Sequence, residues 1–330
     1  MRISALIFAV FICFCIFALI YGCTGKLPGQ QVTIAREQFF NYTVHFCAEE
    51  DCMQVIKAQL QSAEKSVDCA LYGISDGLLS GLAQRQDITT KIVVDNNAAV
   101  AGKYVESGLV YKYKATGIMH NKYCVIDNRT ILTGSFNPTP ASKGDYNNLL
   151  IINSTTLAEF YQNDFQGLYV HHRRLATVNN ALLNTTVVEV YFCPADNCAA
   201  ALIGELRKAN SSIVFAAYSF TSPGIANELV VKLSEGVNIS GVIEKSTIGS
   251  KYSKHEVLAA NGVSIAIESS KKLMHHKFFV IDSSVVVTGS FNPTENADTR
   301  NAENLIFIRS PELAEKYANE FNRIYKNMSS

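Results

Sequence analysis

Two stretches of the chain repeat a histidine and a lysine at the same spacing. His120 and Lys122 are two residues apart in an apolar, strand-like run, and His275 and Lys277 repeat this arrangement. Because side chains alternate across a strand, each histidine points to the same face as its lysine. An imidazole can act as a nucleophile or a proton carrier, and an ammonium group neutralises an anion. The pattern predicts a site for a bound phosphate group.

Each stretch continues into a second polar pair. Ser135 and Asn137 follow the first histidine motif, and Ser290 and Asn292 follow the second. They are again two residues apart, so each copy can present a hydroxyl and an amide toward the same pocket. We expect these groups to donate hydrogen bonds to the non-bridging oxygens of the phosphate.

Other residues of the motif are predicted to have different roles. Asn121 and His276 lie between each histidine and its lysine, so they point to the opposite face and are not assigned to the site. Asp127 and Asp282 end each apolar run, and we expect them to hold the following hairpin rather than to react. Few acidic side chains that could bind a metal ion accompany the histidines, lysines, serines and asparagines of the two motifs.

The two motifs belong to a long internal repeat, which predicts the fold. Residues 119–139 read MHNKYCVIDNRTILTGSFNPT, and residues 274–294 read MHHKFFVIDSSVVVTGSFNPT. Apolar strand patterns alternate with helical patterns around both copies, which is typical of a sheet covered by helices. We therefore predict an α/β protein made of two lobes, each a mixed β-sheet flanked by helices. The lobes span residues 41–170 and 187–327, and residues 171–186 connect them.

The MHxKxxVID and TGSFN patterns resemble the phospholipase D superfamily over nearly all of the chain beyond its first two dozen residues. The FCxxDxC-like opening of each half is similar to small bacterial and archaeal members that include nucleases. The resemblance implies that one motif histidine attacks phosphorus and forms a phosphohistidine. The other protonates the leaving alcohol and then activates water. It also implies one site at the internal interface of a pseudo-symmetric monomer, with no metal and no cofactor.

The resemblance and the chain order predict His120 as the nucleophile and His275 as the general acid and base, with exchanged roles as the alternative. The family places a carboxylate behind the motif histidine, and Glu303 is expected to lie behind His275. The aligned residue of the first half is Asn147, whose amide orients an imidazole but cannot stabilise an imidazolium as a carboxylate does. Asp145 is a second candidate for the missing carboxylate.

The beginning of the chain differs in kind from the rest. Arg2 is the only charge before Lys26, and residues 3–22 are almost wholly apolar. A helix of about 20 such residues spans a bilayer core. We predict a signal peptide or membrane anchor over residues 1–23, including a lipoprotein signal ending at Cys23, with a buried core helix as the alternative. The catalytic region is then extracytoplasmic, either secreted or membrane-anchored.

Cysteines bracket equivalent segments of the two halves. Residues 47–52 and 193–198 each begin and end with a cysteine. In an oxidising compartment each pair could close a small disulfide loop, whereas four thiolates together could hold one zinc ion. Cys69 and Cys124 lie inside apolar runs and are predicted to be inert core residues.

Composition narrows the class of protein. Of 330 residues, 48% are hydrophobic and 18% are charged, which excludes a disordered chain. The 29 basic and 29 acidic residues give no net charge, which argues against a protein bound mainly to a polyanion.

The leading prediction for the function is hydrolysis of a phospholipid at a membrane, releasing the headgroup and leaving phosphatidic acid. The alternatives are a metal-independent nuclease on DNA or RNA, a phosphatidyltransferase of cardiolipin-synthase type, and a non-catalytic binding module.

Overall fold

The computed structural model describes residues 34–170 and 179–326. The predicted signal peptide or anchor at residues 1–23 lies outside these ranges, as does much of the predicted connector. Within the described ranges, no helix is long and apolar enough to cross a membrane.

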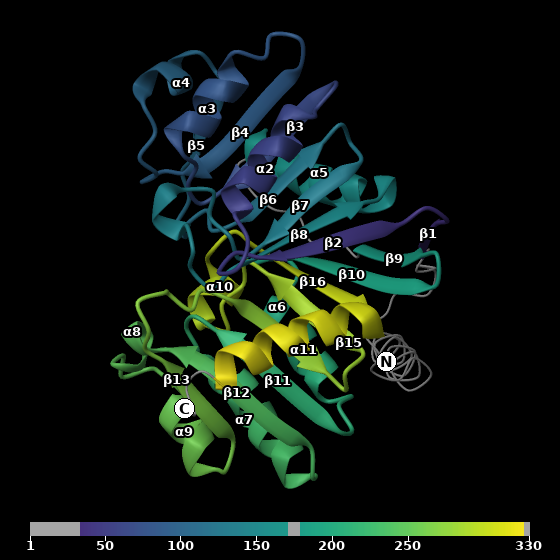
Figure 1. Cartoon of the computed structure of the whole chain (residues 1–330), viewed down its shortest axis with the longest axis vertical. Helices are drawn as coiled ribbons and strands as arrows, with labels where there is room; N and C mark the ends of the chain where they lie inside the picture. Colours follow the sequence, from purple (N-terminus) through teal and green to yellow (C-terminus); the bar gives the residue numbers. More distant parts are fainter. Residues whose placement is uncertain (1–33, 171–178, 327–330) are drawn as a thin grey trace, which may run out of the picture. The chain divides into compact units, whose positions relative to one another are not determined.

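A mixed sheet of seven strands forms the first lobe (Figure 1). Its strands are β2 (Asn41–Phe46), β3 (Ser66–Leu71), β4 (Thr89–Asp95), β5 (Val110–Tyr113), β6 (Lys122–Ile126), β7 (Thr130–Gly134) and β8 (Asn148–Asn153). Their order across the sheet is β2-β8-β7-β6-β3-β4-β5. Strands β3, β4 and β5 run parallel to one another, and the other neighbours are antiparallel.

A sheet of nine strands forms the second lobe. Its strands are β1 (Ala35–Glu37), β9 (Asn179–Leu183), β10 (Thr186–Cys193), β11 (Ser212–Ala217), β12 (Asn238–Glu244), β13 (Ser264–Glu268), β14 (Lys277–Ile281), β15 (Val285–Gly289) and β16 (Glu303–Arg309). The order β1-β9-β10-β16-β15-β14-β11-β12-β13 repeats that of the first sheet from β10 onward. Strands β1 and β9 extend its edge, so the segment predicted as a connector contributes a strand.

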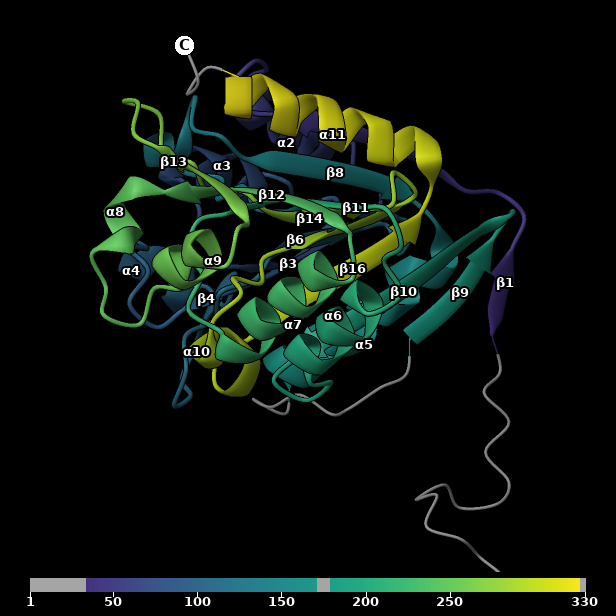
Figure 2. The same cartoon turned by 90° about the horizontal axis from the view of Figure 1, so that it is seen from below.

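Helices cover both faces of each sheet. The longer ones are α2 (Cys52–Gln61), α3 (Asp76–Ala83), α5 (Thr155–Tyr169), α6 (Cys198–Leu206), α7 (Pro223–Ser234) and α11 (Pro311–Lys326). The shorter ones are α4 (Gly102–Glu106), η1 (Pro140–Ser142), α8 (Lys245–Ile248), α9 (His255–Ala260) and α10 (Glu295–Thr299). Figure 2 shows α11 on one face of the second sheet and α6 and α7 on the other.

The largest hydrophobic core joins the two lobes. It buries Tyr161 and Phe165 of α5 together with Tyr317 and Phe321 of α11 and residues of both sheets. The outer faces of the two sheets have separate cores, under α2 and α3 in the first lobe and under α6 and α7 in the second. The predicted fold class, a two-lobed tandem repeat of mixed sheets flanked by helices, is confirmed.

All six cysteines within the described residues form disulfides. The pairs bracketing segments 47–52 and 193–198 close small loops, in place of the alternative zinc site. Cys69 and Cys124 are also bonded, so their prediction as inert core residues was wrong. They are directly paired on β3 and β6 with Cα atoms 4.0 Å apart, a register that apolar sequence context does not reveal.

Candidate active site

The two histidine–lysine pairs lie at equivalent ends of β6 and β14. His120 and Lys122 are buried, as is Lys277. The Nζ atom of Lys122 donates to the carbonyl oxygen of His120 at 2.7 Å, and that of Lys277 donates to the carbonyl of His275 at 2.6 Å. Each lysine therefore holds the backbone of its own histidine while its ammonium group stays beside the imidazole.

The backbone of each motif is bonded to the opposite lobe. The His120 N–H donates to the carbonyl of Ala302 at 2.9 Å, and the His275 N–H donates to the carbonyl of Tyr146 at 2.9 Å. The charge of Lys122 also acts on His275 from the other lobe. The structure thus brings the two motifs together at the internal interface.

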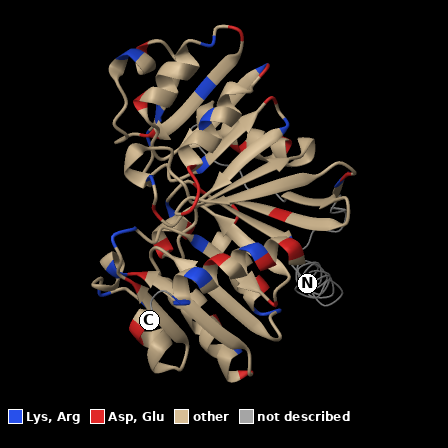
Figure 3. Cartoon of the chain, viewed as in Figure 1, with Lys and Arg blue, Asp and Glu red and all other residues tan. Residues whose placement is uncertain are grey.

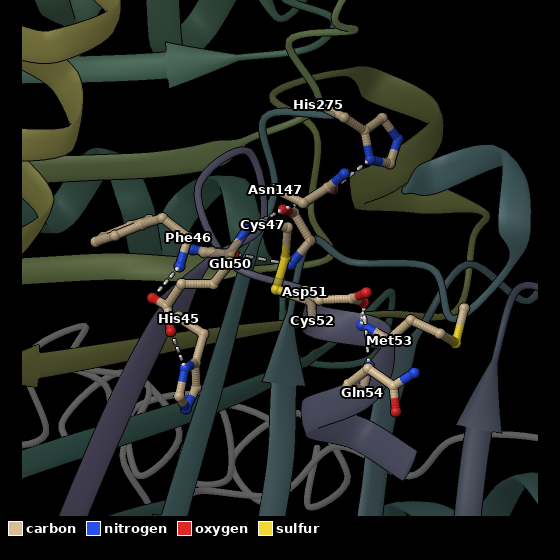
Figure 4. The surroundings of a disulfide bond; sticks show 12 residues. His45, Phe46, Cys47, Glu50, Asp51, Cys52, Met53, Gln54, Asn147 and His275 are labelled. Atoms are coloured by element: carbon tan, nitrogen blue, oxygen red, sulfur yellow. Dashed lines mark hydrogen bonds and ion pairs between the residues drawn. A yellow bond between two sulfur atoms is a disulfide. The ribbon is translucent and has the colours of Figure 1, made fainter. Parts of the chain in front are cut away.

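The residues behind the two histidines are exchanged between the lobes. Nδ1 of His120 lies 2.8 Å from both carboxylate oxygens of Glu303. Nδ1 of His275 lies 2.9 Å from Oδ1 of Asn147, and Figure 4 shows this second contact. The expectation that Glu303 supports His275 was wrong. Asp145 instead accepts a hydrogen bond from the backbone N–H of Leu273 at 3.0 Å.

Direct hydrogen bonds from an asparagine near the start of β8 and another near the start of β16 to the opposite sheet explain this exchange. The Thr133 hydroxyl donates to Oδ1 of Asn304 at 2.9 Å, and Nδ2 of Asn148 donates to the hydroxyl of Thr288 at 2.8 Å. These four buried side chains fasten the starts of β8 and β16 against the other lobe. Asn147 directly precedes Asn148, and Glu303 directly precedes Asn304. Each is therefore held behind the histidine of the other lobe.

Glycines let β8 and β16 approach the following polar loops. Gly134 and Gly289 have φ values of 137° and 144°, a region that side chains rarely adopt. A Cβ atom there would lie 2.4 Å from the carbonyl oxygen of Asn148 and 2.3 Å from that of Asn304. The glycine of each GSFN sequence therefore sets the position of the serine that follows it.

The hydroxyls of the GSFN serines are bonded to the residues behind the histidines. The Ser135 hydroxyl donates to Oδ1 of Asn147 at 3.0 Å, and the Ser290 hydroxyl donates to Glu303. Both serines are fully buried. A hydroxyl has one proton to donate, so in this arrangement neither can donate to a phosphate. They position the residues behind the histidines instead, a role that their motif spacing does not distinguish from ligand binding.

The amides of GSFN have a free polar atom in both copies. Oδ1 of Asn137 and Oδ1 of Asn292 are buried without a hydrogen-bond partner among the described residues, and so is Nδ2 of Asn147. The unpaired atoms of Asn137 and Asn292 are acceptors, so a group that meets them there must be a donor, whereas a phosphate oxygen would bind the Nδ2 side of each amide. The predicted phosphate contact of Asn137 and Asn292 stays a prediction.

Asp127 and Asp282 lie in the hairpins at the far ends of β6 and β14. Each carboxylate accepts hydrogen bonds from three consecutive backbone N–H groups, those of residues 64–66 and 210–212 respectively. Burial alone would raise the pKa of each carboxyl, but these bonds lower it. The contacts fit a role in holding the hairpin against the segment that enters β3 or β11.

Two tyrosines that the sequence analysis did not single out lie beside the site. The ring centroid of Tyr72 lies 5.3 Å from that of His120, and Tyr218 lies 4.9 Å from His275. The ammonium groups of Lys122 and Lys277 lie 5.3 Å from the centroids of the same rings. The two tyrosines occupy the same place in the repeated segments SVDCALYGI and SIVFAAYSF. This repetition is the sequence feature that could have identified them as site residues.

Burial and mutual repulsion lower the pKa values of the basic groups. Burial lowers the pKa of His120, and Glu303 partly opposes that effect. The pKa of His275 falls further because of burial and the charges of Lys277 and Lys122. Burial likewise lowers the pKa of Lys122 to about 7 and that of Lys277 well below its usual value. A bound phosphate would relieve this repulsion.

Metal ligands are not gathered in this part of the molecule. Over residues 34–170 and 179–326, no cluster of three or more His, Cys, Asp or Glu side chains could hold a metal ion.

Comparison with known proteins identifies the repeat. A family model described as "Cardiolipin synthase, PLD-like domain" matches residues 56–169 and again residues 202–325. A phospholipase D of Rickettsia conorii is 34% identical over 150 residues, which cover 45% of this chain and 75% of that protein. A mitochondrial cardiolipin hydrolase of Xenopus tropicalis is 29% identical over 137 residues, which cover 41% of this chain and 65% of that protein.

A solved structure matches both lobes at once. The phosphatidylserine synthase of Haemophilus influenzae covers 86% of this chain with a TM-score of 0.66 and 14% identity, a similarity that concerns the fold alone. The two matches to the family model together span most of the chain. The chain therefore belongs to the phospholipase D superfamily, carries its PLD-like domain twice in one polypeptide, and is a phosphodiesterase.

Proposed function

We propose that this protein hydrolyses phospholipids through a phosphohistidine, releasing the headgroup alcohol and leaving phosphatidic acid. The observation that carries the proposal is the unequal support of two histidines at one interface, Glu303 behind His120 and Asn147 behind His275. The relatives named phospholipase D and mitochondrial cardiolipin hydrolase support a lipid as the substrate.

His120 is the nucleophile in this proposal. Its Nδ1–H donates to Glu303, which leaves the Nε2 lone pair free to attack phosphorus. The bond from phosphorus to the headgroup oxygen breaks as the Nε2–phosphorus bond forms, and protonated His275 gives its Nε2 proton to the leaving oxygen. The phosphorylated imidazole carries a positive charge, which the Glu303 carboxylate stabilises.

Water then completes the reaction. His275, now neutral, takes a proton from a water molecule whose oxygen attacks phosphorus. The bond between phosphorus and His120 breaks, phosphatidic acid leaves, and both histidines return to their starting states. Burial and the charges of Lys277 and Lys122 lower the pKa of His275 in the empty site. The negative charge of the bound phosphodiester opposes this lowering, so His275 carries its proton when substrate is bound and releases it readily to the leaving oxygen. Asn147 is a neutral partner and adds no negative charge that would retain the proton.

The lysines and the GSFN amides bind the phosphate oxygens in this mechanism. Lys122 and Lys277 supply positive charge, and the Nδ2 groups of Asn137 and Asn292 supply hydrogen-bond donors. Tyr72 and Tyr218 form the walls beside the two histidines.

We place the catalytic region outside the cytoplasm. Disulfides persist in oxidising compartments, and three of them lie within the described residues. This agrees with the sequence-based prediction of a signal peptide or anchor at residues 1–23.

The test uses the full chain in the presence of EDTA. Vesicles of phosphatidylcholine and of diphosphatidylglycerol, single- and double-stranded DNA, and RNA are supplied to the wild type and to His120→Ala and His275→Ala. His45→Ala is the matched control, because His45 pairs with Glu50 away from the site. Lipid turnover that is lost in both site variants and kept in the control supports the proposal.

Other outcomes decide between the alternatives. Cleavage of DNA or RNA with inert lipid would establish a nuclease instead. Accumulation of a new phosphatidyl ester when a second alcohol is added, without phosphatidic acid, would establish a transferase. Lipid turnover that survives in His120→Ala would contradict the assigned nucleophile.

A further inference from the structure

A disulfide lies directly beside the partner of His275 (Figure 4). Cys47 follows the last residue of β2 and is bonded to Cys52. Its backbone N–H donates to the carbonyl oxygen of Asn147 at 2.8 Å, and Oδ1 of the same asparagine lies 2.9 Å from Nδ1 of His275. A single residue therefore connects the disulfide loop to the histidine that we assign as general acid and base.

The disulfide fixes the path of the chain between β2 and α2. Cys52 is the first residue of α2, so the bond joins the end of a strand to the start of a helix. Both cysteines are buried. Closing so short a loop limits the conformations open to residues 48–51, and it thereby keeps the Cys47 N–H in place behind Asn147.

The loop also contacts the segment that leads into His275 from the second lobe. The carbonyl of Ala48 accepts from Nζ of Lys272 at 3.1 Å, and Lys272 precedes His275 by three residues. The His275 N–H in turn donates to the carbonyl of Tyr146, the residue before Asn147. The loop is thus bonded to both sides of the contact between His275 and Asn147.

Ion pairs connect the loop to both lobes. The turn between β2 and α2 is acidic, and Figure 3 shows it where the two lobes meet. Oδ2 of Asp51 lies 3.1 Å from Nζ of Lys143 in the first lobe, and Oε1 of Glu49 lies 2.8 Å from Nη1 of Arg323 on α11 of the second. Partly exposed pairs of this kind contribute little each, so the covalent bond supplies most of the constraint on the loop.

The second lobe repeats the arrangement around the other histidine. Cys193 ends β10 directly opposite Glu303 on β16, and its disulfide partner Cys198 is the first residue of α6. Glu303 is the partner of His120. Each short disulfide loop therefore adjoins the residue behind one histidine, and the two loops adjoin the partners of different histidines.

We propose that the loop closed by Cys47 and Cys52 is a positioning element for the acid and base half of the reaction, because it sets where Asn147 meets His275. The inference rests on the proposed phosphohistidine mechanism. His275 protonates the leaving oxygen in the first step, and an imidazole displaced from its partner transfers that proton more slowly. A leaving group that departs as a stable anion does not need the proton. Opening this loop should therefore slow the release of an alcohol but not that of p-nitrophenolate.

The experiment measures release of the leaving group in the first turnover, by rapid mixing with enzyme in excess over lipid. The two substrates are phosphatidylcholine and phosphatidyl-p-nitrophenol, which share the phosphatidyl group that is transferred to His120. The full chain with Cys47→Ser and Cys52→Ser is compared with the wild type. The variant is expected to release choline about tenfold more slowly or less, the effect of misplacing a reacting group, and p-nitrophenol at the wild-type rate.

The other short loop provides the matched control. Cys193→Ser with Cys198→Ser opens a loop of the same size at the equivalent place in the repeat. Glu303 supports the attacking imidazole, which both substrates need, so this variant is expected to slow the release of choline and of p-nitrophenol alike.

A second variant tests the loop with its disulfide intact. Glu49→Gln with Lys272→Gln removes the two side-chain contacts to the second lobe that are described above. It should slow choline release by a smaller factor and leave p-nitrophenol release unchanged. Glu64→Gln with Lys271→Gln makes the same changes of charge at other exposed positions and is the control. This variant decides the question if thermal unfolding shows that the serine variant is not folded.

The outcomes that overturn the inference differ from those that overturn the proposed function. Equal slowing of both leaving groups when the Cys47–Cys52 loop is opened, or an unchanged rate of choline release in the folded variant, would refute the positioning role while lipid hydrolysis stands. If the serine variant is unfolded, choline release at the control rate in Glu49→Gln with Lys272→Gln has the same meaning. If the wild type hydrolyses neither ester, the proposed function fails and the inference fails with it.

Discussion

The carboxylate of Glu303 lies 2.8 Å from Nδ1 of His120, although 183 positions separate the two residues in sequence and they belong to different lobes. The matching contact of His275 is to an amide, that of Asn147. The site is therefore assembled by exchange across the interface, and its two imidazoles have unequal electrostatic partners. This inequality leads to the first two predictions.

Glu303→Gln should lower kcat for lipid hydrolysis by about 10- to 100-fold, the usual cost of removing a partner that orients a reacting imidazole. The neutral amide no longer stabilises the positive charge on phosphorylated His120, so kcat should fall more than KM changes. Steady-state kinetics on vesicles measure both constants. Glu312→Gln, an exposed residue of α11 paired with Lys316, is the control. An unchanged kcat in Glu303→Gln would remove Glu303 from the mechanism.

Asn147→Asp should move the alkaline limb of the pH profile upward. A carboxylate beside His275 favours the imidazolium and raises its pKa, which burial and the neighbouring lysines now lower. The general acid then stays protonated to a higher pH, by about one unit or more. The measurement is kcat/KM against pH for both proteins, with Asn153→Asp as a control at the far end of β8. A profile that stays in place would assign the acid role to another group.

Lys122 should make the protein less stable near neutral pH than in mild alkali. Burial lowers its pKa from 10.5 in the unfolded chain to about 7 in the folded protein. Between these values the unfolded state binds more protons, so the free energy of unfolding rises with pH, by at most about 1.4 kcal/mol per pH unit from this group.

Urea unfolding between pH 7 and 9.5 tests this sign. The free energy of the wild type minus that of Lys122→Met should increase across the range, while the same difference for Lys57→Met, an exposed lysine of α2, should stay flat. A difference that decreases with pH would show that the folded protein holds this ammonium group in a favourable charged state.

The disulfide between Cys69 and Cys124 should contribute more to stability than the one between Cys47 and Cys52. Its sequence separation is 55 against 5. Loop-closure entropy then gives about 4 kcal/mol for the longer loop and about 2 kcal/mol for the shorter one.

Paired Cys→Ala variants and urea unfolding measure the two contributions. The Cys193 and Cys198 pair, which has the same separation as the pair at 47 and 52, provides a matched control for loop size. A larger loss from opening either short loop would show that local contacts outweigh chain entropy.

The period of the sequence pattern correctly predicted the features that depend on strand geometry alone, such as the direction of each side chain. Alternation along a strand placed His120 with Lys122 and turned His276 away, where its Nε2 lies 3.1 Å from Oε1 of Glu320 on α11. The internal repeat likewise predicted two equivalent sheets. Both inferences need only neighbours in sequence, because strand geometry has a fixed period.

Contacts that depend on the docking of the two lobes or on the register between strands could not be predicted from sequence periodicity. The repeat aligned Glu303 with the half that contains His275, and only the docking of the lobes reveals that it serves His120. The same applies to Ser290, whose single proton is used by Glu303, and to Cys69, whose partner depends on strand register. A residue type shows which bonds are available, and the tertiary arrangement decides which of them form.

The tandem arrangement also has an evolutionary consequence. Two identical subunits encoded by one gene must carry the same residue behind both reacting histidines, so any mutation changes both at once. In this polypeptide Glu303 and Asn147 have separate codons, and each position can be selected for one half of the reaction without altering the other. Fusion of the two copies thus permits a division of labour that a homodimer cannot inherit.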